Sequence, residues 1–248
     1  MRLDYEHVEK SLIEWLKGKV QDAKAEGVVV GLSGGIDSAV SSILAKKTFP
    51  NNTLGLIMPC YSNQQDKVDA IKVAKKFNVD YKIKKLDHLY DSFKELVEAG
   101  QKESKENLAL ANAKPRLRMV TLYYYAAQNN YLVLGTDNWS ELKVGYFTKY
   151  GDGGIDLTVL GRLVKTEVRE LAKHLGVPQE IIDKKPSAGL WEDQTDEDEM
   201  GLTYEQLDRY ILTGNAQLEV KEKIENLSAK NSHKLEPIPV PAREILLT

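Results

Sequence analysis

The chain has 248 residues, a formal net charge of −3, 42% hydrophobic residues and a single cysteine, Cys60. This composition is typical of a soluble globular protein and gives no strong electrostatic attraction to nucleic acid. One cysteine excludes a disulfide framework or a multi-thiolate metal site within one chain, and we expect Cys60 to be a small buried or strand-end residue. There is neither a signal-peptide pattern nor an apolar run that could span a bilayer, so we expect a cytoplasmic protein with no nucleic-acid or membrane partner.

Predicted strands and helices alternate along the chain. Short apolar or alternating runs predict strands at 28–32, 53–59, 81–86 and 131–135. Helical spacing, or a charged helical pattern, predicts helices at 8–20, 38–44, 68–77, 90–100, 115–124 and 168–176. The order predicts an α/β fold with a doubly wound parallel sheet flanked by helices, whose ligands bind beyond the carboxyl ends of the strands. From about residue 205 we expect helix, a polar linker and an extended proline-rich arm.

The loop GLSGGIDS, residues 31–38, joins the first strand to the next helix. Its glycines allow backbone amides to approach an anion, and the helix N-terminus and two serine hydroxyls add favourable dipoles and donors. It matches neither the Walker loop nor the G-x-G-x-x-G pattern. The simpler interpretation is a tight turn in which Asp37 or Ser38 caps the helix. The whole string, between strand and helix, favours a phosphate site.

Asp37 requires an explanation, because a carboxylate beside a polyphosphate is repelled unless a cation lies between them. Mg²⁺ takes one or two carboxylates together with phosphate oxygens, so Asp37 is a candidate metal ligand. Glu141, a few residues beyond the fourth strand, is placed to share that metal. Most glutamates, however, are simply exposed on the surface.

SGGIDS (33–38) resembles the SGGxDS signature of the PP-loop ATP pyrophosphatases, which cleave ATP between the α and β phosphates. Three further strings are similar to those of the ammonia-dependent NAD⁺ synthetases: GTDNWSE (135–141), GYFTKYGDGGIDL (145–157), and KPSAGLW (185–191) followed by QTDE (194–197). The resemblance covers nearly the whole chain and implies an adenine nucleotide alpha hydrolase-like, Rossmann-like fold. Val159 and Asp193 depart from the proline and the glycine expected in some relatives.

The resemblance also implies residue roles. The implied ATP-binding residues are Gly31, Leu32, Ser33, Gly34, Gly35, Ile36, Asp37, Ser38, Thr136, Lys165 and Ser187. The implied contacts of deamido-NAD⁺ (nicotinic acid adenine dinucleotide) are Arg116, Lys149, Asp156, His233 and Lys234. Asp37 and Glu141 are the implied Mg²⁺ ligands, and Asp37, Lys149 and Lys165 are the implied catalytic residues.

The residues by themselves say less about several of these positions. Lys149 lies in a loop that is either a solvated connector or a substrate lid, where it could compensate developing negative charge. Arg116 and Arg118 oppose the dipole of a helix start, which weakly suggests a nearby anion. His233 and Lys234 would be interpreted as exposed linker residues. The acidic stretch at 191–199 would be interpreted as a solvated loop rather than a metal cluster.

The resemblance implies a single synthetase domain over 1–248 with no glutaminase domain. It implies a homodimer that amidates deamido-NAD⁺ with ammonia through an adenylated intermediate, giving NAD⁺, AMP and pyrophosphate in the last step of NAD⁺ biosynthesis. Ammonia would arrive free or from a separate partner. One alternative is a tRNA-modifying PP-loop enzyme, which should show a basic surface or a thiol pair. The other is a non-catalytic nucleotide sensor, which needs no metal beside the α–β bridge.

Overall fold

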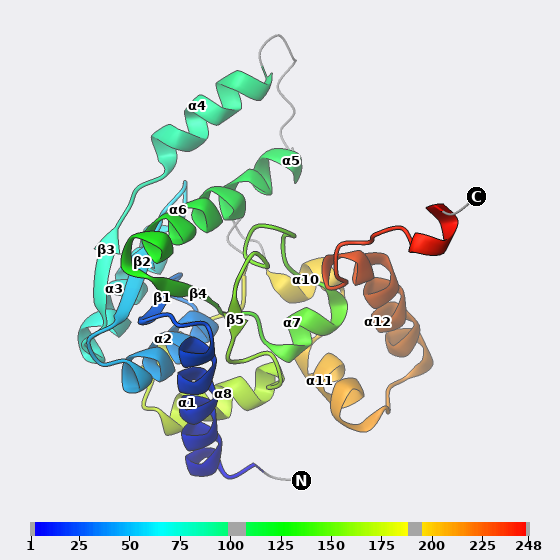
Figure 1. The fold of residues 1–248 in the computed structure, drawn as a ribbon. Helices are drawn as coiled ribbons and strands as arrows, with labels where there is room; N and C mark the ends of the chain where they lie inside the picture. The colour runs from blue at the N-terminus through cyan, green and yellow to red at the C-terminus, as the bar shows by residue number, and fades with distance from the viewer. Residues whose placement is uncertain (1–2, 99–107, 188–194, 247–248) are drawn as a thin grey trace.

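The computed structural model describes residues 3–98, 108–187 and 195–246 (Figure 1). Within them, one parallel sheet runs in the order β3-β2-β1-β4-β5. Its strands are β1 Gly27–Gly31, β2 Thr53–Ile57, β3 Asp80–Ile83, β4 Tyr131–Gly135 and β5 Leu157–Thr158. The predicted doubly wound parallel sheet is confirmed, with β3 at an edge as expected. The chain order reverses at β1 and β4, and ligands of such sheets bind at this switch point.

The helices fill the connections between the strands. Their bounds are α1 Tyr5–Asp22, α2 Ile36–Thr48, α3 Gln64–Lys76, α4 Asp87–Glu98, α5 Leu108–Ala111, α6 Ala113–Asn129, α7 Trp139–Val144, α8 Lys165–His174, α9 Gln179–Ile182, α10 Asp196–Met200, α11 Tyr204–Thr213 and α12 Leu218–Asn231. The predicted helices are present, and α8 begins three residues earlier than its apolar pattern indicated. Short 3₁₀ helices follow at Ser232–Lys234 and Arg243–Leu246. The prediction that the C-terminal arm is extended is therefore wrong at its end.

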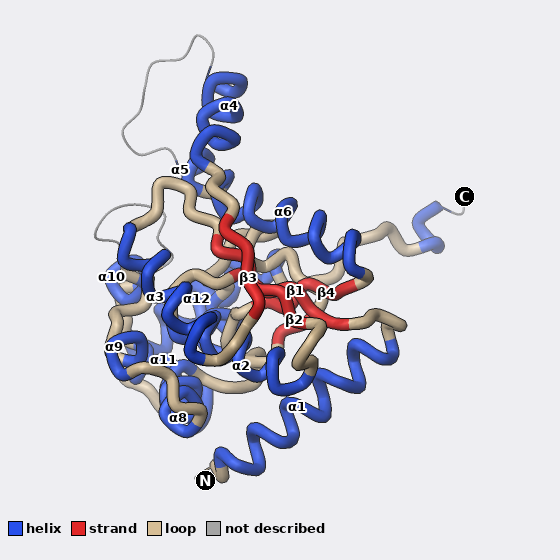
Figure 2. Tube along the Cα trace, turned by 90° about the vertical axis from the view of Figure 1, so that its left-hand side faces the viewer, coloured by secondary structure: helices blue, strands red, loops and turns tan. Residues whose placement is uncertain are grey.

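Alternation along β1 explains the two packed faces of the sheet. Val28 and Val30 belong to one buried cluster with residues of α1, α2 and α8, whereas Val29 belongs to another with Tyr125 and Ala126 of α6. Successive strand residues point to opposite faces, so three consecutive valines supply both cores. In Figure 2 the sheet accordingly lies between α6 on one side and α1 and α2 on the other.

The C-terminal helices form a third apolar cluster beside α7. Tyr204 and Leu207 of α11 and Ile224 of α12 are fully buried in it, together with Val144 of α7. Thr203 and Gln206 form the predicted capping box at the start of α11. Figure 1 shows these helices beyond the β5 side of the sheet, next to α7. They therefore rest against the carboxyl end of β4, where the polar motifs begin.

A buried carboxylate joins this C-terminal group to α7 and α8. Asp208 of α11 is 2% exposed and accepts hydrogen bonds from the Ser140 hydroxyl at 2.5 Å and from the Thr166 amide at 2.7 Å. Thr166 is the second residue of α8, so the negative charge also complements a helix N-terminus. The Ser140 hydroxyl in turn accepts from the Lys165 amide at 3.0 Å.

Among the described helices, none combines the length and the apolar character that crossing a bilayer requires. Helix α4 instead leaves the body of the molecule and has no buried residue (Figure 1).

Asp208→Ala is expected to lower the free energy of unfolding by about 2–3 kcal/mol, because a buried serine hydroxyl and a helix N-terminal amide lose a charged acceptor. Urea unfolding of the variant and the wild type measures the difference. Glu205→Ala, an exposed position on the same helix, is the control and should change stability little. A loss for Asp208→Ala as small as that of the control would contradict the assigned role.

Candidate active site

A cavity of about 1140 Å³ lies at the carboxyl ends of the central strands. The loops after β1, β2 and β4 and the segments around 145–152 and 184–187 contribute to its wall. The predicted site residues that line it are Gly31, Leu32, Ser33, Gly35, Ile36, Asp37, Ser38, Thr136, Glu141, Lys165, Ser187 and Lys234. Those absent from its wall are Gly34, Arg116, Lys149, Asp156 and His233. The structure therefore gathers the predicted nucleotide residues around the cavity and leaves most of the predicted substrate residues outside its wall.

The glycine loop leaves the start of α2 open to this cavity. Gly35 is the N-cap of α2 and no side chain caps the helix, so the interpretation of Asp37 or Ser38 as its N-cap is wrong. The Ser38 hydroxyl donates to the Gly35 carbonyl at 3.0 Å and accepts from the Ser33 amide at 3.2 Å. These bonds hold the loop in shape. The uncapped N-terminus of a 13-residue helix is a suitable place for an anion.

Gly34 has a positive φ of 83°, and a Cβ there would lie 2.2 Å from the carbonyl oxygen of Asp66. Glycine is therefore required both by its backbone angle and by the close approach of α3. This contact fixes the glycine loop against the first turn of a second helix.

At the centre of the cavity, the buried ammonium of Lys165 joins two carboxylates. Its Nζ atom lies 2.6 Å from Asp37 Oδ2 and 3.1 Å from Glu141 Oε1, and its side chain is 2% exposed. Burial by itself would lower the pKa of Lys165, but the carboxylates of Asp37 and Glu141 outweigh it and raise that pKa. Lys165 is therefore charged, and the prediction that Asp37 and Glu141 lie together agrees with the geometry.

Asn138 orients both carboxylates of this pair. Its side-chain amide donates to Asp37 Oδ1 at 2.9 Å, and its backbone amide donates to Glu141 Oε2 at 3.0 Å. The second bond belongs to the capping box of α7. Burial raises the pKa of Glu141 to about 7, with Lys165 opposing the rise and Asp37 adding to it. A cation bound beside Glu141 would favour its ionised form.

Two oxygen-bearing groups suit a hard divalent cation. Mg²⁺ typically keeps several waters and takes one or two carboxylates with substrate phosphates, which Asp37 and Glu141 could supply beside the open start of α2. Among the described residues there is no cluster of three or more His, Cys, Asp or Glu side chains that could hold a metal alone. The donor set thus fits a metal that arrives with phosphate.

Two further carboxylates, Asp137 and Asp196, line the cavity although neither was predicted as a site residue. Asp137, 6% exposed, lines the cavity, and its Oδ2 atom has no hydrogen-bond partner among the described residues. Burial, followed by repulsion from Asp152, Glu141 and Asp37, raises the pKa of Asp137 well above its ordinary value. It belongs to the string GTDNWSE, and its position directly after β4 was the available signal.

The interpretation of 191–199 as a solvated loop is wrong at Asp196. It is 4% exposed and begins α10, with Thr195 as N-cap. The buried Tyr204 hydroxyl donates to Asp196 Oδ2 at 2.9 Å and to Glu141 Oε1 at 3.2 Å. Through this tyrosine the C-terminal helices contact the site, and no local sequence pattern predicts that contact. Residues 188–194, including Asp193 and Trp191, lie outside the described part of the chain.

The predicted substrate residues form a second group at the rim. Lys149 Nζ donates to the His233 carbonyl, and the Arg116 guanidinium donates to the Lys149 carbonyl at 3.3 Å. Lys234 donates to the carbonyls of Gly145 and Phe147 at 2.7 and 2.8 Å, so its interpretation as an exposed linker residue is wrong. His233 is exposed as expected.

Asp156 lies apart from this rim group. Its carboxylate accepts from the Tyr123 hydroxyl at 3.0 Å and from the Val133 amide of β4 at 2.8 Å. The other helix-start arginine, Arg118, does line the cavity and donates to the Met58 carbonyl at 3.1 Å. Of the two arginines, Arg118 is therefore the one placed to contact an anion in the cavity, because Arg116 does not line it. Cys60 is buried, as expected.

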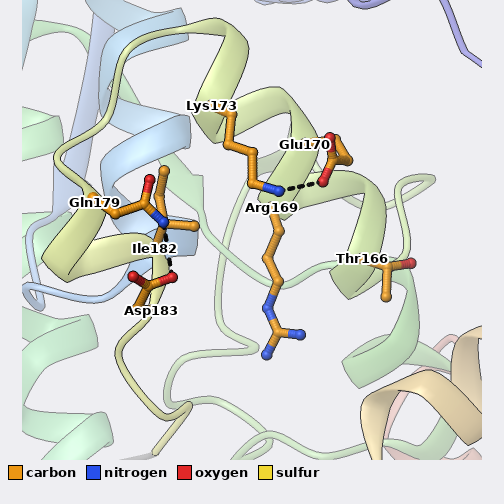
Figure 3. A pocket seen from close by; sticks show the side chains of 7 residues that line it. All are labelled: Thr166, Arg169, Glu170, Lys173, Gln179, Ile182 and Asp183. Atoms are coloured by element: carbon orange, nitrogen blue, oxygen red, sulfur yellow. Dashed lines mark hydrogen bonds and ion pairs between the residues drawn. The ribbon is translucent and has the colours of Figure 1, made fainter.

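A smaller surface pocket of about 480 Å³ lies between α8 and α9 (Figure 3). Its polar side chains largely pair with one another, as in the contacts of Lys173 with Glu170 at 2.6 Å and of Gln179 with Asp183 at 2.8 Å. It shares no lining residue with the central cavity, and we assign it no function.

A glycine loop of this form, after the first inner strand of a doubly wound parallel sheet, defines an α/β nucleotide-binding protein of the PP-loop type. The family model described as NAD synthase matches residues 8–238, and the chain belongs to this family. The two pyrophosphatase-type features, the uncapped loop and Asp37, therefore occur in a member of the NAD synthase family.

Individual relatives are similar over almost their whole length. The NH(3)-dependent NAD(+) synthetase of Carboxydothermus hydrogenoformans is 51% identical over 234 residues, which are 94% of this chain and 96% of the relative. The structure of NMN synthetase from Francisella tularensis superposes with a TM-score of 0.91 at 39% identity, covering 97% of this chain and 99% of that one. The NH3-dependent NAD synthetase from Campylobacter jejuni gives 0.79 at 31%, covering 97% and 100%.

Asp137→Asn tests the buried carboxylate through pH. Because burial raises the pKa of Asp137 in the folded chain, its stabilising contribution is present at low pH and is lost as pH rises through that pKa. The amide cannot ionise, so the melting temperature of the variant relative to the wild type should increase between about pH 5 and about pH 8. Differential scanning calorimetry measures it.

The exposed carboxylate of Asp22 provides the control, since Asp22→Asn should keep a nearly constant difference from the wild type across this range. A constant or falling difference for Asp137→Asn would contradict a raised pKa of this carboxyl in the folded chain.

Proposed function

We propose that this ligase amidates deamido-NAD⁺ with ammonia, consuming ATP and giving NAD⁺, AMP and pyrophosphate. The observation that carries the proposal is the Asp37–Lys165–Glu141 arrangement beside the uncapped start of α2, inside one cavity of a chain from the NAD synthase family. Amides at the loop suit a pyrophosphate leaving group. The acidic pair beside them suits a cation at the bond that breaks.

The proposed reaction has two steps. A nicotinate carboxylate oxygen attacks the α-phosphorus of ATP, the bond to the bridging oxygen breaks, and pyrophosphate leaves on the glycine loop. Ammonia then attacks the carbonyl carbon of the mixed anhydride, loses a proton, and AMP departs. The amides and hydroxyls of residues 31–38 would hold the leaving phosphates, with Thr136 and Ser187, which also line the cavity, contacting ATP.

Lys165 has a defined part in this scheme. Its ammonium offsets part of the negative charge of Asp37 and Glu141, and it is positioned to stabilise negative charge on phosphate oxygens placed against the same pair. Mg²⁺ held by Asp37 and Glu141 would supply charge neutralisation and orientation of the phosphate groups when bound. Lys234, which lines the cavity, and Lys149, Arg116, His233 and Asp156, which lie outside its wall, would contact deamido-NAD⁺ beyond the nucleotide residues.

We further propose that residues 1–248 act as one synthetase domain that uses ammonia itself, in the cytoplasm. A homodimer would place the dinucleotide near the subunit interface. Exposed apolar side chains on α4, α5 and α6, among them Leu89, Leu96, Leu108, Val120 and Tyr124, support an interface on this side of the molecule. A tRNA-modifying enzyme has less support, since the chain has a net charge of −3 and a single, buried cysteine. A nucleotide sensor has less support because Asp37 and Glu141 lie together on Lys165.

A second candidate substrate is nicotinic acid mononucleotide. The observation that favours it is the similarity, at a TM-score of 0.91, to a structure described as an NMN synthetase. Both acceptors carry the same nicotinate carboxylate, so the residues around Asp37 and Lys165 serve either. Only contacts with the adenylate half can distinguish them.

Mass spectrometry of the products from ATP, deamido-NAD⁺, ammonium and Mg²⁺ tests the reaction. We expect NAD⁺ and AMP, and Asp37→Ala should lower turnover by about 100-fold or more because the loop loses its charge partner. Glu205→Ala, remote on the surface, should retain wild-type turnover. ADP in place of AMP would contradict the mechanism.

Competition between the two acceptors tests the substrate. With both present at equal concentration, kcat/KM for deamido-NAD⁺ should exceed that for nicotinic acid mononucleotide by about tenfold or more, since the adenylate half adds binding energy. The amidated products are separated and quantified by chromatography. A preference for the mononucleotide would replace the first candidate with the second.

A further inference from the structure

An ion-pair cluster lies outside the predicted site residues, on the far side of the glycine loop from Lys165. Lys184 Nζ is 2.7 Å from Asp66 Oδ1 and 2.7 Å from Asp69 Oδ2. It also lies 3.4 Å from the Gly34 carbonyl. One side chain therefore connects the glycine loop, the first turns of α3 and the segment that leads to Ser187.

The two carboxylates of this cluster create an electrostatic problem for a phosphate site. Asp66 lines the cavity together with Ser33 and Gly35, and its own carbonyl packs against Gly34. Asp69 is one turn further along α3, on the same face, and is only 5% exposed. Two unneutralised negative charges here would repel a triphosphate on the loop amides, the more so because one of them is shielded from water.

Lys184, which also lines the cavity, is placed to offset much of that charge. Its two carboxylate contacts are equally short, and Asp69 Oδ1 is also satisfied by the Gln65 side chain at 2.7 Å. The carboxylates raise the pKa of Lys184 above its ordinary value even though burial opposes this, so the side chain is charged.

We propose that Lys184 is a positioning residue for ATP, acting by pairing with Asp66 and Asp69 so that their charge does not repel the triphosphate from the glycine loop. The inference rests on the proposed use of this loop for ATP. In this role Lys184 acts through α3 and the loop, and its own ammonium stays on the carboxylates when nucleotide binds. Lys165 is then the cation paired with Asp37, and Lys184 is the cation paired with Asp66 and Asp69.

Isothermal titration calorimetry with MgATP, in the absence of any acceptor, tests the proposal. Lys184→Met should raise the Kd for MgATP by about tenfold or more. The triple variant Lys184→Met, Asp66→Asn, Asp69→Asn carries no unpaired charge and should restore the Kd to within about threefold of the wild type. Lys184→Arg, which keeps the charge, should also bind like the wild type.

Lys72→Met is the matched control, because Lys72 lies on α3 with Asp66 and Asp69 but pairs with Glu180 at the surface. It should leave the Kd unchanged. An unchanged Kd in Lys184→Met, or weak binding by a folded triple variant, overturns the proposal, the latter because it assigns Lys184 a direct contact with phosphate. If Lys184→Met does not fold, the triple variant alone decides between these outcomes.

The same titrations keep this inference separate from the proposed function. A wild-type chain that binds MgATP but forms no NAD⁺ contradicts the proposed reaction and leaves the role of Lys184 open to the comparison of variants. A wild-type chain that binds no MgATP contradicts the proposed function itself.

Discussion

The site depends on one buried charge, the Lys165 ammonium held between Asp37 and Glu141. A buried ion is costly unless it is paired, so this lysine is stable only where both carboxylates reach it. The three residues come from the first turn of α2, from α7 and from the first position of α8. Their mutual attraction thus draws together three helix starts that follow different strands. It also explains an aspartate in a phosphate loop, because the loop is not left with an uncompensated negative charge.

The C-terminal helices support this arrangement from behind. Tyr204 of α11 donates to Glu141, and Asp208 of the same helix holds Ser140, whose hydroxyl accepts from the Lys165 amide. Each contact fixes one member of the charged trio in orientation. Preorganised dipoles and charges contribute most to catalysis when they need not rearrange, so a helix distant in sequence can matter as much as the loop itself.

Sequence reasoning found the elements whose signals are local. Three valines, a glycine loop and helical spacing specify β1, the turn and α2 within about twenty residues, and the fold class follows from the alternation. Tyr204 and Lys184 could not be found in this way, because their roles come from contacts with residues 63 and more than 110 positions away. The burial of Asp196 likewise contradicts its acidic neighbourhood, since only tertiary packing against Tyr204 distinguishes it from solvated carboxylates.

The charge pattern of the cavity limits what can enter it. Asp37, Asp137 and Glu141 line its centre, and only the first and the last share a described cation. Burial raises the pKa of both Asp137 and Glu141, which shows that this centre disfavours further negative charge. A bare polyphosphate would meet repulsion at the acidic centre, whereas one that carries a divalent cation would bring the charge the carboxylates lack. The amides of the glycine loop and the acidic pair with its cation would therefore act as complementary halves of one site for a nucleotide triphosphate.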